Sequence, residues 1–258
     1  MSQFQLAKGG RLRLHTVRSV LGRWAGSVRR NGWRGTMQNV AALAEDFWFD
    51  RWHGTETART VALRGLNVRG RHKHLGIDYA PTRVRAFRRL MTWLAAPAGP
   101  LAPGGVLVDF GCGKGRVLCV AAAYPFRRAV GVEFAPELCA VCRENLQIMR
   151  HRKRRGKPAP ALSVVEADAA DYSFAGDETV LFFFNPFRPA VMARVLANLH
   201  ASVAAHPRRV LIILSNPGGL ADALATDPAV ERIAAYAYGS TLFHIHATGP
   251  DPRRTDAG

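Results

Sequence analysis

From residue 106 onward, short apolar segments alternate with segments of helical spacing, and this alternation restricts the possible folds more than any other feature. Strands that alternate with helices, and that are apolar throughout, form a parallel sheet covered by helices on both faces. The sequence therefore predicts a doubly wound α/β fold. The expected strands are 106–110, 129–133, 162–167, 179–185 and 208–216, and the expected helices are 116–123, 136–150 and 189–204.

The C-terminal part has a different pattern. Residues 230–238 and 241–248 are expected to be two strands joined by a tight turn at Gly239-Ser240, which makes an antiparallel pair. The whole is then a mostly parallel seven-stranded sheet that ends in an antiparallel hairpin. Before the sheet, residues 82–94 have helical spacing, with Thr82 as the expected cap.

The 258 residues suit one large domain or two small ones. We expect three parts: a basic, mainly helical N-terminal extension over 1–75, the sheet domain over 76–250, and a flexible tail over 251–258.

Positive charge is concentrated near the N-terminus. The formal net charge is +17, and residues 1–90 hold 18 basic and 5 acidic side chains. Within this region, residues 14–28 carry one apolar stripe at helical spacing, flanked by arginines. Such a helix binds a membrane surface, an acidic partner or nucleic acid, or it packs its stripe on the protein's own body. Arginine-rich, acid-poor starts also occur in organelle transit peptides.

Other classes of protein are disfavoured. Four cysteines are too few for a disulfide scaffold, and no apolar segment reaches the roughly 18 residues that a membrane-spanning helix needs. The first residues lack the apolar segment of a secretory signal, so a cytoplasmic protein is expected. Cys139 and Cys142 have the spacing of a redox or metal pair, but they fall inside an expected helix and are interpreted as buried small residues. No metal site is expected.

A glycine-rich loop follows the first expected strand, where doubly wound sheets bind ligands. It reads Asp109-Phe-Gly111-Cys112-Gly113-Lys-Gly115. A phosphate-binding P-loop requires Ser or Thr after the lysine, and a dinucleotide fingerprint requires glycine where Arg116 stands. The remaining pattern, D-x-G-x-G-x-G, resembles the first motif of class I S-adenosylmethionine (SAM)-dependent methyltransferases.

Residues at the ends of the next three strands fit the same family. Glu133 ends the second strand, and its carboxylate can accept hydrogen bonds from ribose hydroxyls. By resemblance, Asp168 after the third strand contacts adenine, and Asn185 after the fourth lies near the transferred methyl group. Without the motif, Glu133 is a solvated strand end, Asp168 a helix cap and Asn185 a turn residue. The resemblance implies these cofactor-binding residues: Asp109, Gly111, Cys112, Gly113, Gly115, Glu133, Phe134, Asp168, Ala169, Asn185 and Thr82.

Two segments before the first strand extend the resemblance to about residues 45–248. Residues 49–57, FDRWHGTET, are similar to a bacterial group of class I methyltransferases of unassigned substrate. Residues 79–82, YAPT, are similar to seven-strand protein lysine methyltransferases, in which this stretch covers the methionine end of SAM. The resemblance implies that Tyr79 and Thr82 contact the cofactor.

The expected chemistry is methyl transfer to nitrogen. Asn185 and Tyr79 are the candidate catalytic residues, because the Asn185 oxygen can accept amine hydrogens and orient the nucleophile. Pro186 and Phe187 are the candidate substrate contacts. Methyltransferases that act on DNA bases carry Asn-Pro-Pro-aromatic, and this chain has one proline fewer. A protein or small-molecule amine is therefore the favoured acceptor.

Three other functions stay open. The chain could methylate RNA, with the basic N-terminal region and the basic loop at 150–157 binding the backbone. It could bind SAM or a nucleotide without catalysis. An NAD-dependent oxidoreductase is the least favoured, because of Arg116 in the glycine loop.

Overall fold

The computed structural model describes residues 32–33, 35, 37, 40–41, 44–62, 79–97, 99–151, 160–184, 189–216, 220–236 and 240–245. The chain forms two compact units, Met1–Glu45 and Asp46–Gly258. The expected boundary between residues 75 and 76 stays a prediction, since residues 63–78 lie outside the described part. The expected N-terminal helix at 14–28, the 150–157 loop beyond His151 and the tail at 251–258 also lie outside it.

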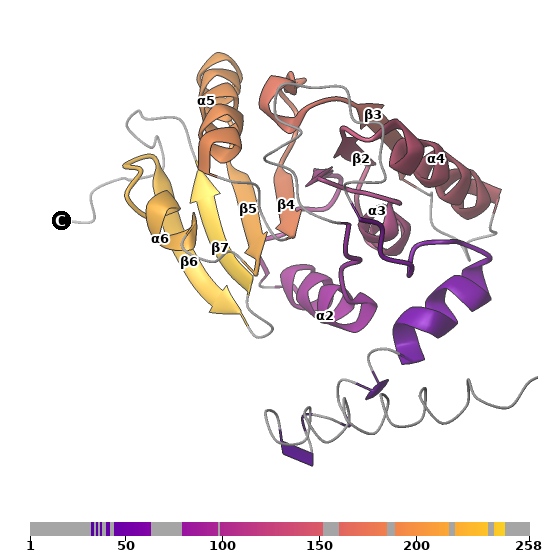
Figure 1. The fold of residues 1–258 in the computed structure, drawn as a ribbon. Helices are drawn as coiled ribbons and strands as arrows, with labels where there is room; N and C mark the ends of the chain where they lie inside the picture. The colour runs from indigo at the N-terminus through magenta and orange to yellow at the C-terminus, as the bar shows by residue number, and fades with distance from the viewer. Residues whose placement is uncertain are drawn as a thin grey trace, which may run out of the picture. The chain divides into compact units, whose positions relative to one another are not determined.

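A seven-stranded sheet forms the centre of the second unit (Figure 1). The strand order is β3-β2-β1-β4-β5-β7-β6. The first five strands in this order are parallel, and β7 runs antiparallel to both β5 and β6. The bounds are β1 Val106–Phe110, β2 Arg128–Glu133, β3 Ala161–Glu166, β4 Val180–Phe184, β5 Val210–Ser215, β6 Val230–Tyr236 and β7 Ser240–Ile245.

The predicted sheet is confirmed, with one difference in burial. Strands β1, β4 and β5 are buried almost throughout, as expected for central parallel strands. β3 is an edge strand, and Val165 on it is 40% exposed. It is therefore not buried on both faces, although its sequence is as apolar as that of a central strand.

Helices cover both faces of the sheet. One core cluster joins α2 (Val84–Leu94), α3 (Arg116–Ala121) and α4 (Pro136–His151) to one face. The other joins α5 (Pro189–Ala205), α6 (Leu220–Leu224) and the short 3₁₀ helix η3 (Ala169–Asp171) to the opposite face. Phe182 and Phe183, adjacent on β4, point into the two clusters and are each 1% exposed. Both phenylalanines therefore belong to the core, one on each face of the sheet.

Helix α2 begins at Val84, one residue later than a cap at Thr82 predicts. Its N-cap is Arg83 rather than Thr82, and the Arg83 side chain accepts no hydrogen bond from the first turn of the helix. The acceptor comes from elsewhere in the sequence: the Asp46 carboxylate accepts the Val84 backbone N–H at 3.0 Å. Phe87 on the buried face of α2 then packs edge-on against Phe182, with ring centroids 5.0 Å apart.

The C-terminal strands are confirmed as antiparallel, with a topology that the sequence pattern does not specify. β7 lies between β5 and β6, and a bulge interrupts the β6–β7 pairing between Arg232 and Ala234. Ser240 is the first residue of β7, and residues 237–239 of the expected turn lie outside the described part. Helix α6 was not expected.

Candidate functional site

The glycine loop connects β1 to α3 at the carboxyl edge of the parallel strands. Gly111, Gly113 and Gly115 have φ values of +75°, +53° and +80°, a region that other residues rarely adopt. The loop is tied to the end of β2, because the backbone N–H groups of Gly111 and Cys112 both donate to the Val132 carbonyl. Three alternating glycines are thus required by the backbone itself.

Glu133 fixes the centre of this loop. Its Oε2 accepts the Gly113 N–H at 2.9 Å, and its Oε1 accepts the N–H groups of Phe134 and Ala135 at 3.0 and 2.9 Å. The side chain is buried, so it is not a solvated strand end. Burial raises the pKa of Glu133, and the three backbone donors oppose that rise.

Asp109 is a second buried carboxyl group at the same edge, on the neighbouring strand β1. Burial raises its pKa well above the ordinary value, and the charge of Glu133 raises it further. Within the described part of the chain, no cation pairs with Asp109 or Glu133. The site therefore holds two buried acidic groups with unbalanced charge when both are ionised.

Tyr79 closes over the glycine loop from a segment that precedes the sheet. A Cβ atom added to Gly113 would lie 2.1 Å from the Tyr79 ring, so the ring occupies the space that a side chain would need. The Tyr79 hydroxyl donates to the Thr57 carbonyl at 2.8 Å. Burial raises the pKa of this phenol, which stays protonated at neutral pH.

The segment 50–58 is organised by one carboxylate. Asp50 accepts hydrogen bonds from the hydroxyls of Thr55 and Thr57 at 2.8 and 2.6 Å. It also accepts the backbone N–H groups of Thr57 and Ala58. Every donor lies within the sequence that suggested the family resemblance or directly after it. One hydrogen-bonded turn thus gives Asp50, Thr55 and Thr57 a structural role.

Two polar residues attach this turn to the glycine loop. Lys114 is buried and pairs with Glu56 at 2.5 Å, and its ammonium lies 5.9 Å from the centre of the Tyr79 ring. Asn145, buried on α4, accepts the Glu56 N–H and donates to the carbonyls of Glu56 and Lys114. The turn, the glycine loop and α4 are thereby joined at one point.

Arg116 is the structural residue that sequence reasoning missed. It is 2% exposed and pairs with Asp46 at 3.1 Å and with Asp50 at 3.6 Å. Its Nε donates to the Thr57 hydroxyl at 2.7 Å. The sequence held a signal for this role: an arginine opens an otherwise apolar helix, and Asp46 and Asp50 stand four residues apart, on one side of a helical segment.

The remaining predicted residues are distributed as follows. Asp168 caps η3, where its Oδ1 accepts the Ala170 N–H at 2.9 Å. This is the helix-cap role predicted for Asp168 as the alternative to cofactor binding. Ala169 is buried, and Phe134 is half-buried and packs near Tyr79. Thr82 contributes its backbone carbonyl to Arg116 at 3.5 Å. Asn185, Pro186 and Phe187 lie outside the described residues.

The four cysteines are free and buried. Cys112 fills the notch at Gly131, where an added Cβ would lie 2.4 Å from its sulfur, and Cys142 does the same at Gly115 at 2.5 Å. The Cys139 thiol donates to the Glu133 carbonyl, and burial raises its pKa to about 12. These contacts agree with the interpretation of the Cys139/Cys142 pair as packing residues.

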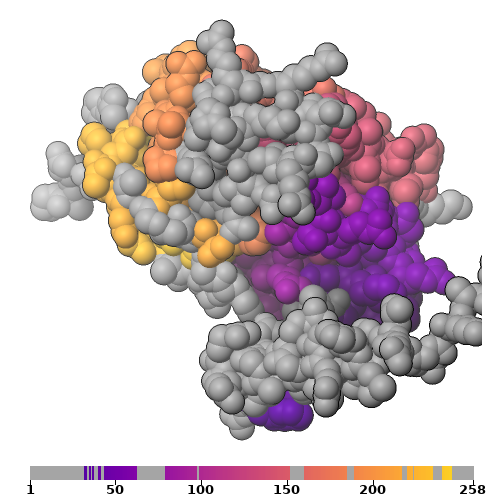
Figure 2. Space-filling view, in the orientation of Figure 1, coloured from indigo at the N-terminus to yellow at the C-terminus, as the bar shows by residue number. Residues whose placement is uncertain are grey.

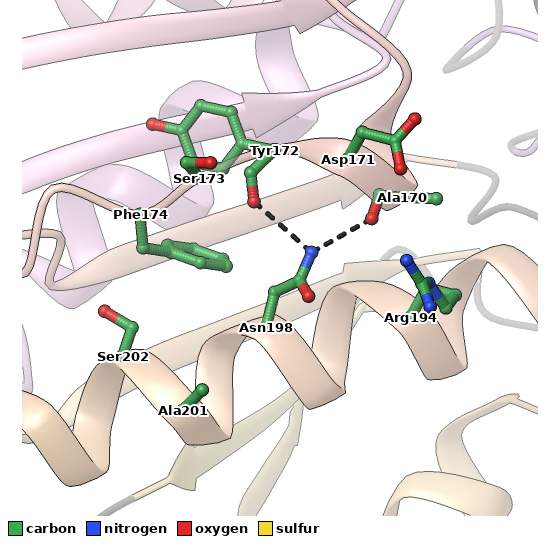
Figure 3. A pocket seen from close by; sticks show the side chains of 9 residues that line it. All are labelled: Ala170, Asp171, Tyr172, Ser173, Phe174, Arg194, Asn198, Ala201 and Ser202. Carbon is green, nitrogen blue, oxygen red and sulfur yellow. Dashed lines mark hydrogen bonds between the residues drawn. The ribbon is translucent and has the colours of Figure 1, made fainter.

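A cavity of about 400 Å³ lies on the other face of the sheet, between residues 170–174 and α5 (Figure 3). Asn198 on α5 lines this cavity and donates to the carbonyls of Ala170 and Tyr172, which joins α5 to the segment 170–174. Arg194 and Asp171 are among the residues that line it. None of the predicted site residues lines this cavity.

Residues 108–186 match the family model described as a methyltransferase domain. Solved structures with a similar arrangement include an RNA methyltransferase from Salinibacter ruber in complex with S-adenosyl-L-homocysteine, at 20% identity, TM-score 0.44, and 69% and 99% of the two chains. Another is the magnesium protoporphyrin IX methyltransferase from Synechocystis PCC 6803 with bound SAM, at 14% identity, TM-score 0.44, and 64% and 79% coverage. A comparison with curated proteins finds no match to the chain.

The matched segment runs from β1 to just beyond β4. It contains the glycine loop, Glu133, Asp168 and the Asn185-Pro186 pair. With the seven-stranded mixed sheet, the match confirms the resemblance to class I methyltransferases that the sequence suggested. The particular bacterial group stays a prediction.

Proposed function

We propose that this chain, which contains a class I methyltransferase domain, transfers the methyl group of SAM to a nitrogen atom of a protein or a small molecule. The family match supports methyl transfer as the reaction class. The pair of buried carboxyl groups beside the three-glycine loop supports SAM as the cofactor. SAM bears a sulfonium and an ammonium group beside one carboxylate, so its net positive charge would offset part of the charge of Asp109 and Glu133, which no described cation does.

The glycine loop would allow SAM to come close to its backbone. The positive φ angles of the loop leave no side chain between the end of β1 and a ligand, and Tyr79 limits the space above Gly113. Glu133 would receive a ribose hydroxyl on Oε2, which accepts only one backbone bond, whereas Oε1 already accepts two. Asp168 would contact adenine from its position as the cap of η3.

The chain's own contribution to the reaction would be orientation. SAM supplies a methyl group that is already activated by the positive sulfur, so alignment with the nucleophile can provide about 7–11 kcal/mol of the barrier reduction. Tyr79 is suited to positioning rather than proton removal, since its phenol is protonated and bonded to Thr57. Thr82 would border the methionine end. Asn185 would orient the acceptor, with Pro186 and Phe187 beside it.

Ligand-induced stabilisation of the purified protein tests the cofactor. S-adenosylhomocysteine at about one hundred times its Kd should raise the free energy of unfolding by about 2.7 kcal/mol. NADH and ATP serve as controls and should give no comparable shift. A shift with NADH alone, or no shift with any ligand, would contradict the proposal.

Labelled SAM incubated with protein and RNA extracts identifies the acceptor class. Label in protein or in small molecules supports the favoured acceptor. Label in RNA, lost steeply as salt is added, favours the RNA alternative, for which the +17 charge is the supporting observation. Binding of S-adenosylhomocysteine with no transfer to any extract would indicate a binding module without catalysis.

A further inference from the structure

Three large aromatic side chains project together from the first described segment of the second unit. Residues 46–53 are helical, and Phe47, Trp48 and Trp52 on this helix are 62%, 60% and 75% exposed. At 100° per residue they share one side with the exposed Arg51, within an arc of about 140°. We call these four residues the aromatic face. Exposed apolar residues gathered in this way mark interaction sites.

Packing within the protein uses the opposite side of the helix. Asp46, Phe49, Asp50 and His53 lie there, and all of them are buried or half-buried. Asp46 caps α2, Asp50 holds the turn at 55–58, and Phe49 belongs to the core. All four residues of the aromatic face are therefore exposed in the described structure. The violet area of the space-filling view, which contains residues 46–62, forms part of the outer surface (Figure 2).

Most exposed charges near the aromatic face are positive. Its helix, which is described without a gap from residue 44, and the following turn contain four carboxylates. Three are satisfied within the protein: Asp46 by Arg83 and Arg116, Asp50 by the turn, and Glu56 by Lys114. The fourth, Glu45, is half-buried. Helix α2, which packs beside this helix, carries the exposed Arg85, Arg88 and Arg89 and no acidic residue.

We propose that the aromatic face binds the surface of a bilayer that contains anionic phospholipid. Tryptophan and phenylalanine beside arginine is the composition of helices that lie in the membrane interface, where the rings enter the headgroup region and arginine pairs with phosphate. Within the described part of the chain, no helix has the length and apolarity to cross a membrane, so the contact is peripheral. This inference is independent of the proposed methyl transfer.

The ring geometry favours a bilayer over single-stranded nucleic acid. Proteins that bind single strands stack successive bases on aromatic rings. Phe47 and Trp48 stand edge-on to each other at 76°, with centroids 5.9 Å apart, so they offer no common plane to two adjacent bases. Insertion into a headgroup layer has no such geometric requirement.

Vesicle sedimentation with the full chain tests the proposal. Binding should be strong to vesicles with equal parts of phosphatidylcholine and phosphatidylglycerol, and weak to phosphatidylcholine alone. The triple variant Phe47→Ser, Trp48→Ser, Trp52→Ser should lose about tenfold or more in vesicle affinity. Trp93→Ser is the matched control, since Trp93 is 40% exposed on α2 outside the face, and it should bind as the unaltered chain does.

A conservative variant locates the contact. Trp48→Phe with Trp52→Phe keeps the rings, so vesicle binding should persist, while quenching of tryptophan fluorescence by brominated lipid should fall. Equal quenching would place other tryptophans in the bilayer and overturn the assignment.

Two further results would also overturn it. One is equal vesicle binding by the triple variant and the unaltered chain. The other is a triple variant that loses affinity for unstructured RNA but not for vesicles. Unchanged urea unfolding and an unchanged S-adenosylhomocysteine shift in the variants would separate failure of this inference from failure of the proposed function.

Discussion

Burial of the Asp109 carboxyl group destabilises the unliganded protein when the group is ionised. The carboxyl group is buried and receives no hydrogen bond from any side chain or backbone donor in the described residues, and its folded-state pKa lies above its unfolded value near 3.8. A raised folded-state pKa means that the folded state binds the proton more tightly. The contribution of protonated Asp109 to the free energy of unfolding is therefore complete below about pH 4, and it is lost as the pH rises through the folded-state pKa of Asp109.

Asp109→Asn should accordingly stabilise the unliganded protein at neutral pH by about 1–3 kcal/mol, because the amide carries no charge to bury. The gain should vanish below about pH 4, where the aspartate is protonated in both states. The same variant should lose most of the S-adenosylhomocysteine shift. Urea unfolding across pH, with and without ligand, measures both effects, and Asp222→Asn on the exposed side of α6 is the control. A destabilised Asp109→Asn variant would contradict this account.

Gly113 is required both by its backbone and by its neighbour. Its φ of +53° makes an L-residue cost about 1–2 kcal/mol, and a Cβ would lie 2.1 Å from the Tyr79 ring. Gly113→Ala should therefore destabilise the protein by more than Gly104→Ala, since Gly104 has a φ of +77° and open space around it. Thermal unfolding measures the difference. Adding Tyr79→Ala should cost less than the sum of the single changes, and strict additivity would show that the ring is not the obstacle.

At the scale of elements, a buried arginine joins α3 to the segments that precede the sheet. Arg116 contacts Asp46, Asp50 and Thr57 and is 2% exposed, so its loss removes the buried cation that the two carboxylates share. Arg116→Met should destabilise the protein by about 3–5 kcal/mol. It should also weaken S-adenosylhomocysteine binding, because the turn at 55–58 and Tyr79 lose their anchor.

Arg143→Met provides the matched comparison. Arg143 pairs with Glu166 at 3.2 Å, but both side chains are about half exposed, so the expected loss is under about 1 kcal/mol. Urea unfolding of the two variants under the same conditions gives the contrast. Equal losses would mean that the Arg116 network does not stabilise the fold.

At the scale of the whole molecule, two core clusters meet back to back at the central strands. Phe182 packs against Phe87 of α2, and Phe183 stacks on Phe110 at a centroid distance of 4.9 Å, on the opposite side of β4. Phe182→Ala should cost about 3–5 kcal/mol in the free energy of unfolding. Val165→Ala on the exposed edge strand should cost far less.

The two clusters should also unfold together. Far-ultraviolet circular dichroism and tryptophan fluorescence should give coincident transitions for Phe182→Ala, because one sheet supports both layers. Separate transitions would show that the faces are independent.

The sequence by itself determined the strands and most helix bounds. Apolar segments and helical spacing are local properties, so β1 matches its expected bounds and the other strands agree to within a few residues. Glycine permits the three positive φ angles of the loop, although Gly105 and Gly131 do not adopt one. The predicted grouping of Asp109, Glu133 and the glycine loop follows because parallel strands end at one edge.

Only the tertiary structure decided which distant residues meet. That β7 separates β5 from β6, that β3 is an edge, and that Asp46 caps α2 in place of Thr82 all depend on how layers pack. Arg116 is the clearest case, because the spacing of Asp46 and Asp50 places two carboxylates on one side of a helix but does not say which cation they meet. Such pairings depend on burial, which brings opposite charges together from remote parts of the chain.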